Sequence, residues 1–182
     1  QDIPPLEEIE MQPPPGFARS HVGTPPGTWS DAGAQALALL ASLLERGELD
    51  EYDLARRLVA WYEQGYMVVD GRVFDVGNQT RRVITALQQG VGPLAAGPRE
   101  AENNGNGSLM RVLPLALWHR GGEASLMYDA MQQSMLTNGH GRARTCCVIY
   151  CIWARATLEG AEDAWTTAAM KVNDHRLRRW HE

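Results

Sequence analysis

The sequence has 182 residues, of which 44% are hydrophobic and 21% are charged, and these ordinary shares exclude a collagen-like polymer, a coiled coil and a disordered chain. The formal net charge of -5 argues against a broad nucleic-acid-binding surface. No apolar run reaches the roughly 18 residues of a membrane span and the chain does not open with a signal peptide, so we expect a soluble, cytoplasmic protein.

Residues 1–26 are rich in proline, which fixes φ and removes a backbone donor. We therefore predict an extended N-terminal segment over residues 1–26. The length of the remainder suits one domain with a single core, which we place at residues 27–182.

Apolar residues recur at three- and four-residue spacing in several segments, which predicts helices. These segments are residues 31–44, 50–64, 80–88, 108–118, 123–135 and 142–158, followed by a last helix from near Glu162. Pro114 should kink its helix or confine it to short turns. Residues 67–76 fit a hairpin or a loop, and we favour the loop. Because no period-two alternation persists, we predict an all-α fold with several helices.

Ser30 and Asp31 place a hydroxyl and a carboxylate side by side at the start of the first predicted helix. Hard oxygen ligands at such a position can bind a divalent cation. An aspartate there is more often a cap that offsets the helix macrodipole. From these residues alone we favour the cap, and a metal site stays open.

The Asn- and Gly-rich loop from Asn103 to Ser108, which continues to Arg111, is the strongest candidate for a ligand site. Glycine lets the backbone approach a ligand, and a helix start at Ser108 would offer N–H groups and a hydroxyl to a diphosphate. Arg111 either neutralises a phosphate or braces the loop through a buried carboxylate pair. A plain surface turn explains this composition about equally well.

Thr137 to Gly141 form a third break that places polar side chains at a predicted helix start. His140 either donates to a phosphate or caps the helix, and we favour the structural role. Three such helix starts in one small domain nevertheless favour a common ligand site.

Four short segments occur in a fixed order along the chain. They are Gly27-Thr28-Trp29-Ser30-Asp31-x-Gly33-Ala34-Gln35, Phe74-Asp75-Val76-Gly77-x-x-Thr80, Gly105-Asn106-Gly107-Ser108-Leu109-Met110-Arg111 and Thr137-x-Gly139-His140. In this order they resemble the ADP-ribosylglycohydrolase family, to which the dinitrogenase-reductase-activating glycohydrolase and the ADP-ribosyl-acceptor hydrolases belong. The resemblance covers residues 27–158.

The resemblance implies an orthogonal all-α fold around a cleft with two Mg2+ ions, or Mn2+ in some members. A Ser/Thr-Asp-Asp triplet binds these metals in the family, which makes Ser30 and Asp31 metal ligands here and Asp31 also the catalytic carboxylate. Ala32 stands where the family has its second aspartate. The family's second metal motif, Asp-x-Asp-Thr/Ser, is missing from the sequence, so we expect a partial domain that lacks its C-terminal part.

The resemblance also implies a set of ADP-ribose-binding residues. They are Asn106, Gly107, Ser108, Met110, Arg111, Asn138 and His140. Asn138 departs from the family, which commonly has a histidine directly after the threonine of this segment.

We therefore expect an ADP-ribosyl hydrolase that acts on ADP-ribose or an ADP-ribosylated protein and is impaired at Ala32. The alternative is a non-catalytic protein that binds ADP-ribose or occludes a modified target. Ala32 fits either an engineered substitution that traps a ligand, which we favour, or a naturally degenerate homologue.

Overall fold

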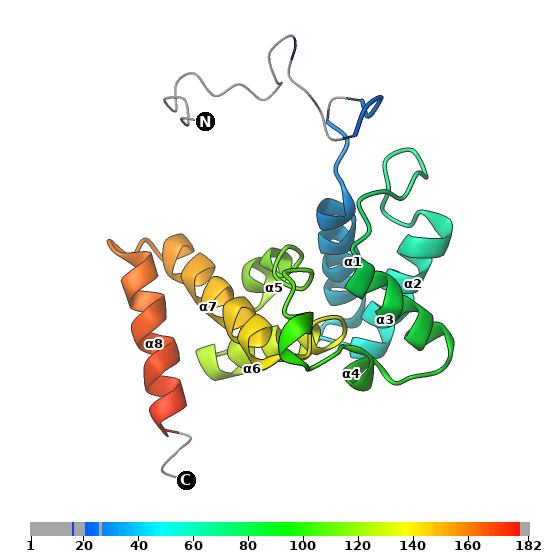
Figure 1. Cartoon of the computed structure of the whole chain (residues 1–182). Helices are drawn as coiled ribbons and strands as arrows, with labels where there is room; N and C mark the ends of the chain where they lie inside the picture. The colour runs from blue at the N-terminus through cyan, green and yellow to red at the C-terminus, as the bar shows by residue number, and fades with distance from the viewer. Residues whose placement is uncertain (1–15, 17–20, 26, 179–182) are drawn as a thin grey trace.

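The computed structural model describes residues 16, 21–25 and 27–178, so the predicted extended segment over residues 1–26 lies almost entirely outside the described part. The described residues form helices and loops without a strand, which confirms the all-α prediction (Figure 1). The elements are α1 (Asp31–Arg46), α2 (Glu51–Gln64), α3 (Asn78–Gln88), α4 (Pro93–Ala96), the short 3-10 helix η2 (Ala101–Asn103), α5 (Leu113–Trp118), α6 (Glu123–Met135), α7 (Gly141–Leu158) and α8 (Ala164–Arg178). None of these helices is both long and apolar enough to cross a bilayer.

The ends of α1 and α2 follow from local chemistry. Gly47 and Gly65 end the two helices with φ of 71° and 70°, the left-handed region that glycine adopts without strain. Asp50 caps α2 by accepting a hydrogen bond from the backbone N–H of Asp53 at 2.9 Å. Ser30 occupies the N-cap of α1, but its hydroxyl donates to Asp31 instead of accepting from the helix.

Pro114 confines its segment as predicted. Residues 108–111 form turns, and α5 begins only at Leu113 with the proline in its first turn. The favoured loop over residues 67–76 is confirmed, since no strand forms there. From sequence we did not predict α4 and η2, two short elements that lie between α3 and the Asn- and Gly-rich loop.

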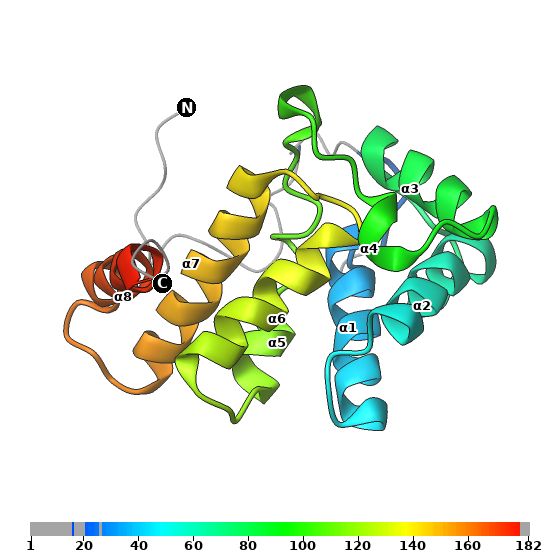
Figure 2. The ribbon, with the colours of Figure 1, turned by 90° about the horizontal axis from the view of Figure 1, so that it is seen from below.

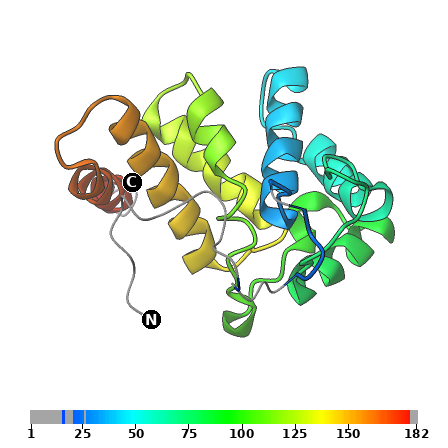
Figure 3. The ribbon, with the colours of Figure 1, turned by 90° about the horizontal axis from the view of Figure 1, so that it is seen from above.

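The helices form two groups on either side of α1. Helices α2 and α3 pack on one side, and α5 links α1 to α7 on the other, with α6 and α8 both against α7 (Figures 1 and 2). The main core contains Leu39, Leu58, Leu115, Leu126 and Ile152, all at most 1% exposed. Three loops meet at one end of the bundle, namely those that precede α1, α5 and α7 (Figure 3).

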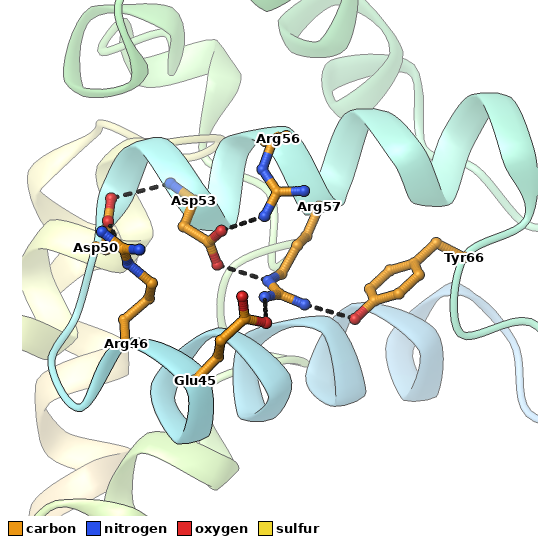
Figure 4. A network of polar contacts seen from close by, with 7 residues as sticks. All are labelled: Glu45, Arg46, Asp50, Asp53, Arg56, Arg57 and Tyr66. Carbon is orange, nitrogen blue, oxygen red and sulfur yellow. Dashed lines mark hydrogen bonds and ion pairs between the residues drawn. The ribbon is translucent and has the colours of Figure 1, made fainter.

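A polar cluster fastens α2 to α1 (Figure 4). Asp53 accepts hydrogen bonds from Arg57 Nε at 2.5 Å and from Arg56, and Arg57 also pairs with Glu45 on α1. The Arg57 guanidinium further donates to the Tyr66 hydroxyl at 2.6 Å. Burial alone would raise the pKa of Asp53, but the bonds from the two arginines lower it to about 2.

We predict that Asp53→Asn lowers the free energy of unfolding at pH 7 by about 2 kcal/mol, because it removes the buried carboxylate of Arg57 and leaves only the exposed Glu45 as its ion-pair partner. The folded-state pKa of Asp53 lies below its ordinary value of 3.8, so this contribution is complete above pH 3.8 and is lost as the pH falls towards 2. Urea denaturation at several pH values measures it. A difference between wild type and variant that persists unchanged near pH 2, or a similar loss in the exposed Glu48→Gln control, would contradict this account.

Candidate functional site

Three of the four sequence motifs line one cleft of about 480 Å3, and the fourth contributes Asn138 to it. This volume suits a small-molecule ligand. The lining residues are Ser30, Asp31, Ala32, Asp75, Gly77, Asn78, Gln79, Thr80, Gly105, Asn106, Gly107, Met110 and Asn138. Of the predicted site residues, the structure therefore brings together the first motif, Asn106, Gly107, Met110 and Asn138.

Asp31 lies at the N-terminal end of α1 and is 9% exposed. Its Oδ1 atom accepts from the Ser30 hydroxyl at 3.2 Å and from the Ala32 N–H at 2.8 Å. Burial raises the pKa of Asp31, the two hydrogen bonds oppose that rise, and the nearby Asp75 carboxylate adds to it. Because both bonds engage Oδ1, the Oδ2 atom is left for a ligand in the cleft.

Trp29 and Gly33 fix the position of this motif. The indole Nε1 of Trp29 donates to the carbonyl of Met67 at 2.9 Å. A Cβ at Gly33 would lie 2.6 Å from the Cβ of Trp29, so only glycine permits this packing. The first motif is thereby tied to the loop that follows α2.

Asp75 is a cleft residue to which the sequence analysis gave no role. It has φ of 60°, a conformation that costs a non-glycine residue about 1 kcal/mol or more and that is concentrated at functional sites. Its carboxylate lies 3.5 Å from the His21 ring nitrogen, and it contributes to the raised pKa of Asp31. The Phe74–Gly77 motif contained the signal, but only the fold shows that this carboxylate shares a cleft with Asp31.

Residues 105–107, the glycine loop, lie against the side-chain amide of Asn138. Asn138 Nδ2 donates to the Gly105 carbonyl at 2.9 Å. A Cβ at Gly107 would come within 3.2 Å of Asn138 Oδ1, and one at Gly105 would come within 3.5 Å of Gln79 Oε1. The glycines therefore let this backbone approach the floor of the cleft closely.

Arg111 braces this loop from beneath and does not line the cleft. The side chain is 0% exposed and donates to Gln133, Gln35, Thr137 and the Gly107 carbonyl. Of the two roles considered from sequence, bracing is the one that the geometry supports. The prediction that Arg111 pairs with a buried carboxylate was wrong, since these acceptors are amide, carbonyl and hydroxyl oxygens.

Ser108 also lies below the cleft, and no helix starts there. Its hydroxyl is buried and bonded to the Ser134 hydroxyl at 2.7 Å, and the Cys147 thiol lies 3.4 Å away. We predicted that this hydroxyl would bind a diphosphate, but in the structure it makes a hydrogen bond within the fold instead. The local sequence could not reveal this, because the partners are on α6 and α7.

His140 caps α7 and is not among the cleft-lining residues. Its Nδ1 accepts from the backbone N–H of Arg142 at 3.2 Å, which matches the structural role that we favoured. The polar contribution of this third segment to the cleft comes from Asn138 instead.

The donors in the cleft do not match a two-ion centre. Among the described residues, no three His, Cys, Asp or Glu side chains converge as a metal site. Asp31, Asp75 and the Ser30 hydroxyl are present, and Ala32 contributes only a methyl group. Mg2+ keeps several waters and is commonly held by one or two carboxylates, so this set fits one ion.

A separate polar hollow of about 750 Å3 contains His119, Ser125 and Asp129. The Arg155 guanidinium, which only donates, lies 3.1 Å from His119 Nδ1, so the histidine proton is on Nε2. That Nε2 lies 3.2 Å from Ser125 Oγ and 3.4 Å from Asp129 Oδ2. A histidine in this tautomer cannot accept a proton from Ser125, so the trio is not a nucleophilic triad.

Comparison with known proteins agrees with the family resemblance of the four sequence motifs. A family model described as ADP-ribosylglycohydrolase matches residues 3–182. The chain is 32% identical over 143 residues to ADP-ribosylarginine hydrolase Tri1 of Pseudomonas putida (strain GB-1), covering 78% of this chain and 38% of that protein. It is 34% identical over 124 residues to the Tri1 protein of Serratia proteamaculans (strain 568), covering 67% and 33%.

A third relative is the ADP-ribosyl-[dinitrogen reductase] glycohydrolase of Rhodospirillum rubrum. The identity is 32% over 124 residues, which cover 68% of this chain and 39% of that protein. The chain thus spans between 33% and 39% of the length of these three relatives.

We predict that Gly97→Ala destabilises the fold by about 3 kcal/mol, because the new Cβ would lie 2.1 Å from the Met135 carbonyl oxygen and 3.1 Å from the Asn138 nitrogen. Urea denaturation measures the loss. Gly92→Ala is the matched control, since a Cβ at Gly92 meets no atom within 4 Å. Equal stability of the two variants would show that Gly97 is not close-packed against Met135 and Asn138.

Proposed function

This chain belongs to the ADP-ribosylglycohydrolase family, and from that premise we propose that its cleft binds the ADP-ribose unit of an ADP-ribosylated protein and supports hydrolysis of the glycosidic bond. The observation that carries the proposal is the convergence of Asp31, the glycine loop and Asn138 on one cleft of ligand size. Because two relatives are named ADP-ribosylarginine hydrolases, we propose an arginine-linked ADP-ribose as the substrate.

The charge of the cleft bears on how a diphosphate binds there. Among the described residues, the lining includes the carboxylates of Asp31 and Asp75 and no lysine or arginine. An anionic diphosphate is repelled by these carboxylates unless a cation lies between them. We therefore propose that one Mg2+, or Mn2+, accompanies the ligand, with Asp31, Asp75 and the Ser30 hydroxyl as the protein donors.

A bound ion of this kind would polarise ligand oxygens and neutralise charge. The chain's own residues would do the remaining work. The Asp31 carboxylate would bind the ion through Oδ2 and so orient the attacking water, while Ser30 and the Ala32 N–H hold its Oδ1 in place. The glycine loop and Asn138 would hold the diphosphate against the backbone.

Ala32 favours a second candidate function. Its methyl group lines the cleft where the resemblance places a ligand carboxylate, so the site lacks charge that would hold a dication and orient water. We propose that turnover is consequently impaired in this chain. A non-catalytic ADP-ribose-binding protein that shields a modified target is the alternative that this residue supports.

We predict that wild type binds free ADP-ribose and that Ala32→Asp raises the affinity for Mg2+ by about tenfold, because a further carboxylate joins the donor set. Isothermal titration calorimetry measures both. The release of ADP-ribose from an arginine-ADP-ribosylated protein should rise by at least about tenfold in the same variant with Mg2+.

The matched control is Ala124→Asp, which adds the same charge at an exposed position in the first turn of α6, away from the cleft. It should change neither Mg2+ affinity nor turnover. ADP-ribose binding without turnover in either protein would favour the non-catalytic alternative. Absence of ADP-ribose binding in wild type would contradict the proposed function in both forms.

A further inference from the structure

We propose that Arg111 is a positioning residue that fixes which atoms at the floor of the cleft donate hydrogen bonds and which accept them. It acts through Thr137 on Asn138, and through Asn138 on the glycine loop (residues 105–107). The ligand named in this proposal rests on the proposed function, whereas the relay itself rests on geometry alone.

The Arg111 guanidinium is a buried cation without a carboxylate partner among the described residues. Its Nε and Nη2 atoms donate to the side chain and the backbone carbonyl of Gln133, at 3.0 and 2.7 Å. Its Nη1 atom donates to Gln35 Oε1 on α1 at 3.2 Å, to the Gly107 carbonyl at 3.4 Å and to Thr137 Oγ1 at 2.9 Å. Burial lowers its pKa to about 10, so the group remains charged at neutral pH.

The direction of the relay follows from the fact that a guanidinium has no acceptor. Thr137 Oγ1 must accept from Arg111, so the hydroxyl proton is free to point at Asn138 Oδ1, 2.7 Å away. Asn138 therefore turns its Nδ2 towards the Gly105 carbonyl, 2.9 Å away. The orientation of this amide is thus set by a charge that does not itself line the cleft.

A second chain of bonds holds the backbone of the same residue. Ser134 Oγ donates to the Asn138 carbonyl at 3.0 Å, so the Ser108 hydroxyl donates to Ser134 at 2.7 Å. The Cys147 thiol in turn donates to Ser108 at 3.4 Å. Both relays end on Asn138, which fixes its main chain and its side chain together.

The consequence for a ligand is a defined donor in the cleft. The Nδ2 group carries two hydrogens, and the Gly105 carbonyl takes one of them. The second N–H is then available to an anionic or carbonyl oxygen of a ligand between the glycine loop and Asp31. An amide at this position presents that donor at every pH, unlike a histidine.

Thr137→Val tests the relay because it keeps the side-chain shape and removes the hydroxyl, while Thr137→Ser restores the hydroxyl. We expect the valine variant to show faster amide hydrogen exchange over residues 105–110 and a loss of ADP-ribose affinity of about fivefold to tenfold. The serine variant should resemble wild type in both measurements. Asp53→Asn is the control for general destabilisation, because it weakens a polar cluster outside the cleft.

Asn138→Asp is a second variant for the case in which Thr137→Val does not fold. It keeps an acceptor for Thr137 but removes the Nδ2 donor, so exchange over residues 105–110 should again rise. Unchanged exchange in the folded variants, or the same increase in Asp53→Asn, would overturn the relay. If wild type fails to bind ADP-ribose, the proposed function fails, while the exchange measurement still decides the relay.

Discussion

The burial of the Arg111 guanidinium, which has no carboxylate partner within the described residues, is the constraint on which the cleft depends. A guanidinium that is buried without a carboxylate must donate hydrogen bonds to neutral oxygen atoms, because its burial would otherwise carry a large desolvation cost. Arg111 finds them on α1, on α6, in the glycine loop and at Thr137. Three of these four segments also contribute cleft residues, namely the start of α1, the glycine loop and the segment of Thr137 and Asn138, so satisfying the cation also assembles the site.

The residues that line the cleft carry negative charge, opposite in sign to the Arg111 cation beneath them. Asp31 and Asp75 face a volume that suits a small ligand, and in the described part of the chain the lining offers no basic side chain to an anion. The proposed binding of ADP-ribose to this acidic lining requires a cation beside the diphosphate. Ala32 removes a carboxylate from that proposed arrangement, so the proposal treats ligand binding and turnover as separate properties to be measured.

The helices could be predicted from sequence because their signals are local. Apolar spacing predicted the extent of α6 at residues 123–135, the start of α1 at residue 31 and the end of α2 at residue 64. The partners of Ser108 and Arg111 are distant in sequence, up to 76 residues for Gln35. The local motif therefore could not predict that these two side chains lie beneath the cleft and do not line it. Asp75 needed the fold as well, since its left-handed backbone and its proximity to Asp31 have no sequence signature.

The most direct test of the account is a titration of the isotope-labelled chain with ADP-ribose and Mg2+, followed by amide chemical shifts in two-dimensional NMR. The account predicts that the largest changes map to Asp31, Ala32, Gly105–Gly107 and Asn138, with none around His119 and Asp129. Changes concentrated in the His119 hollow, or no changes at saturating ADP-ribose, would contradict it.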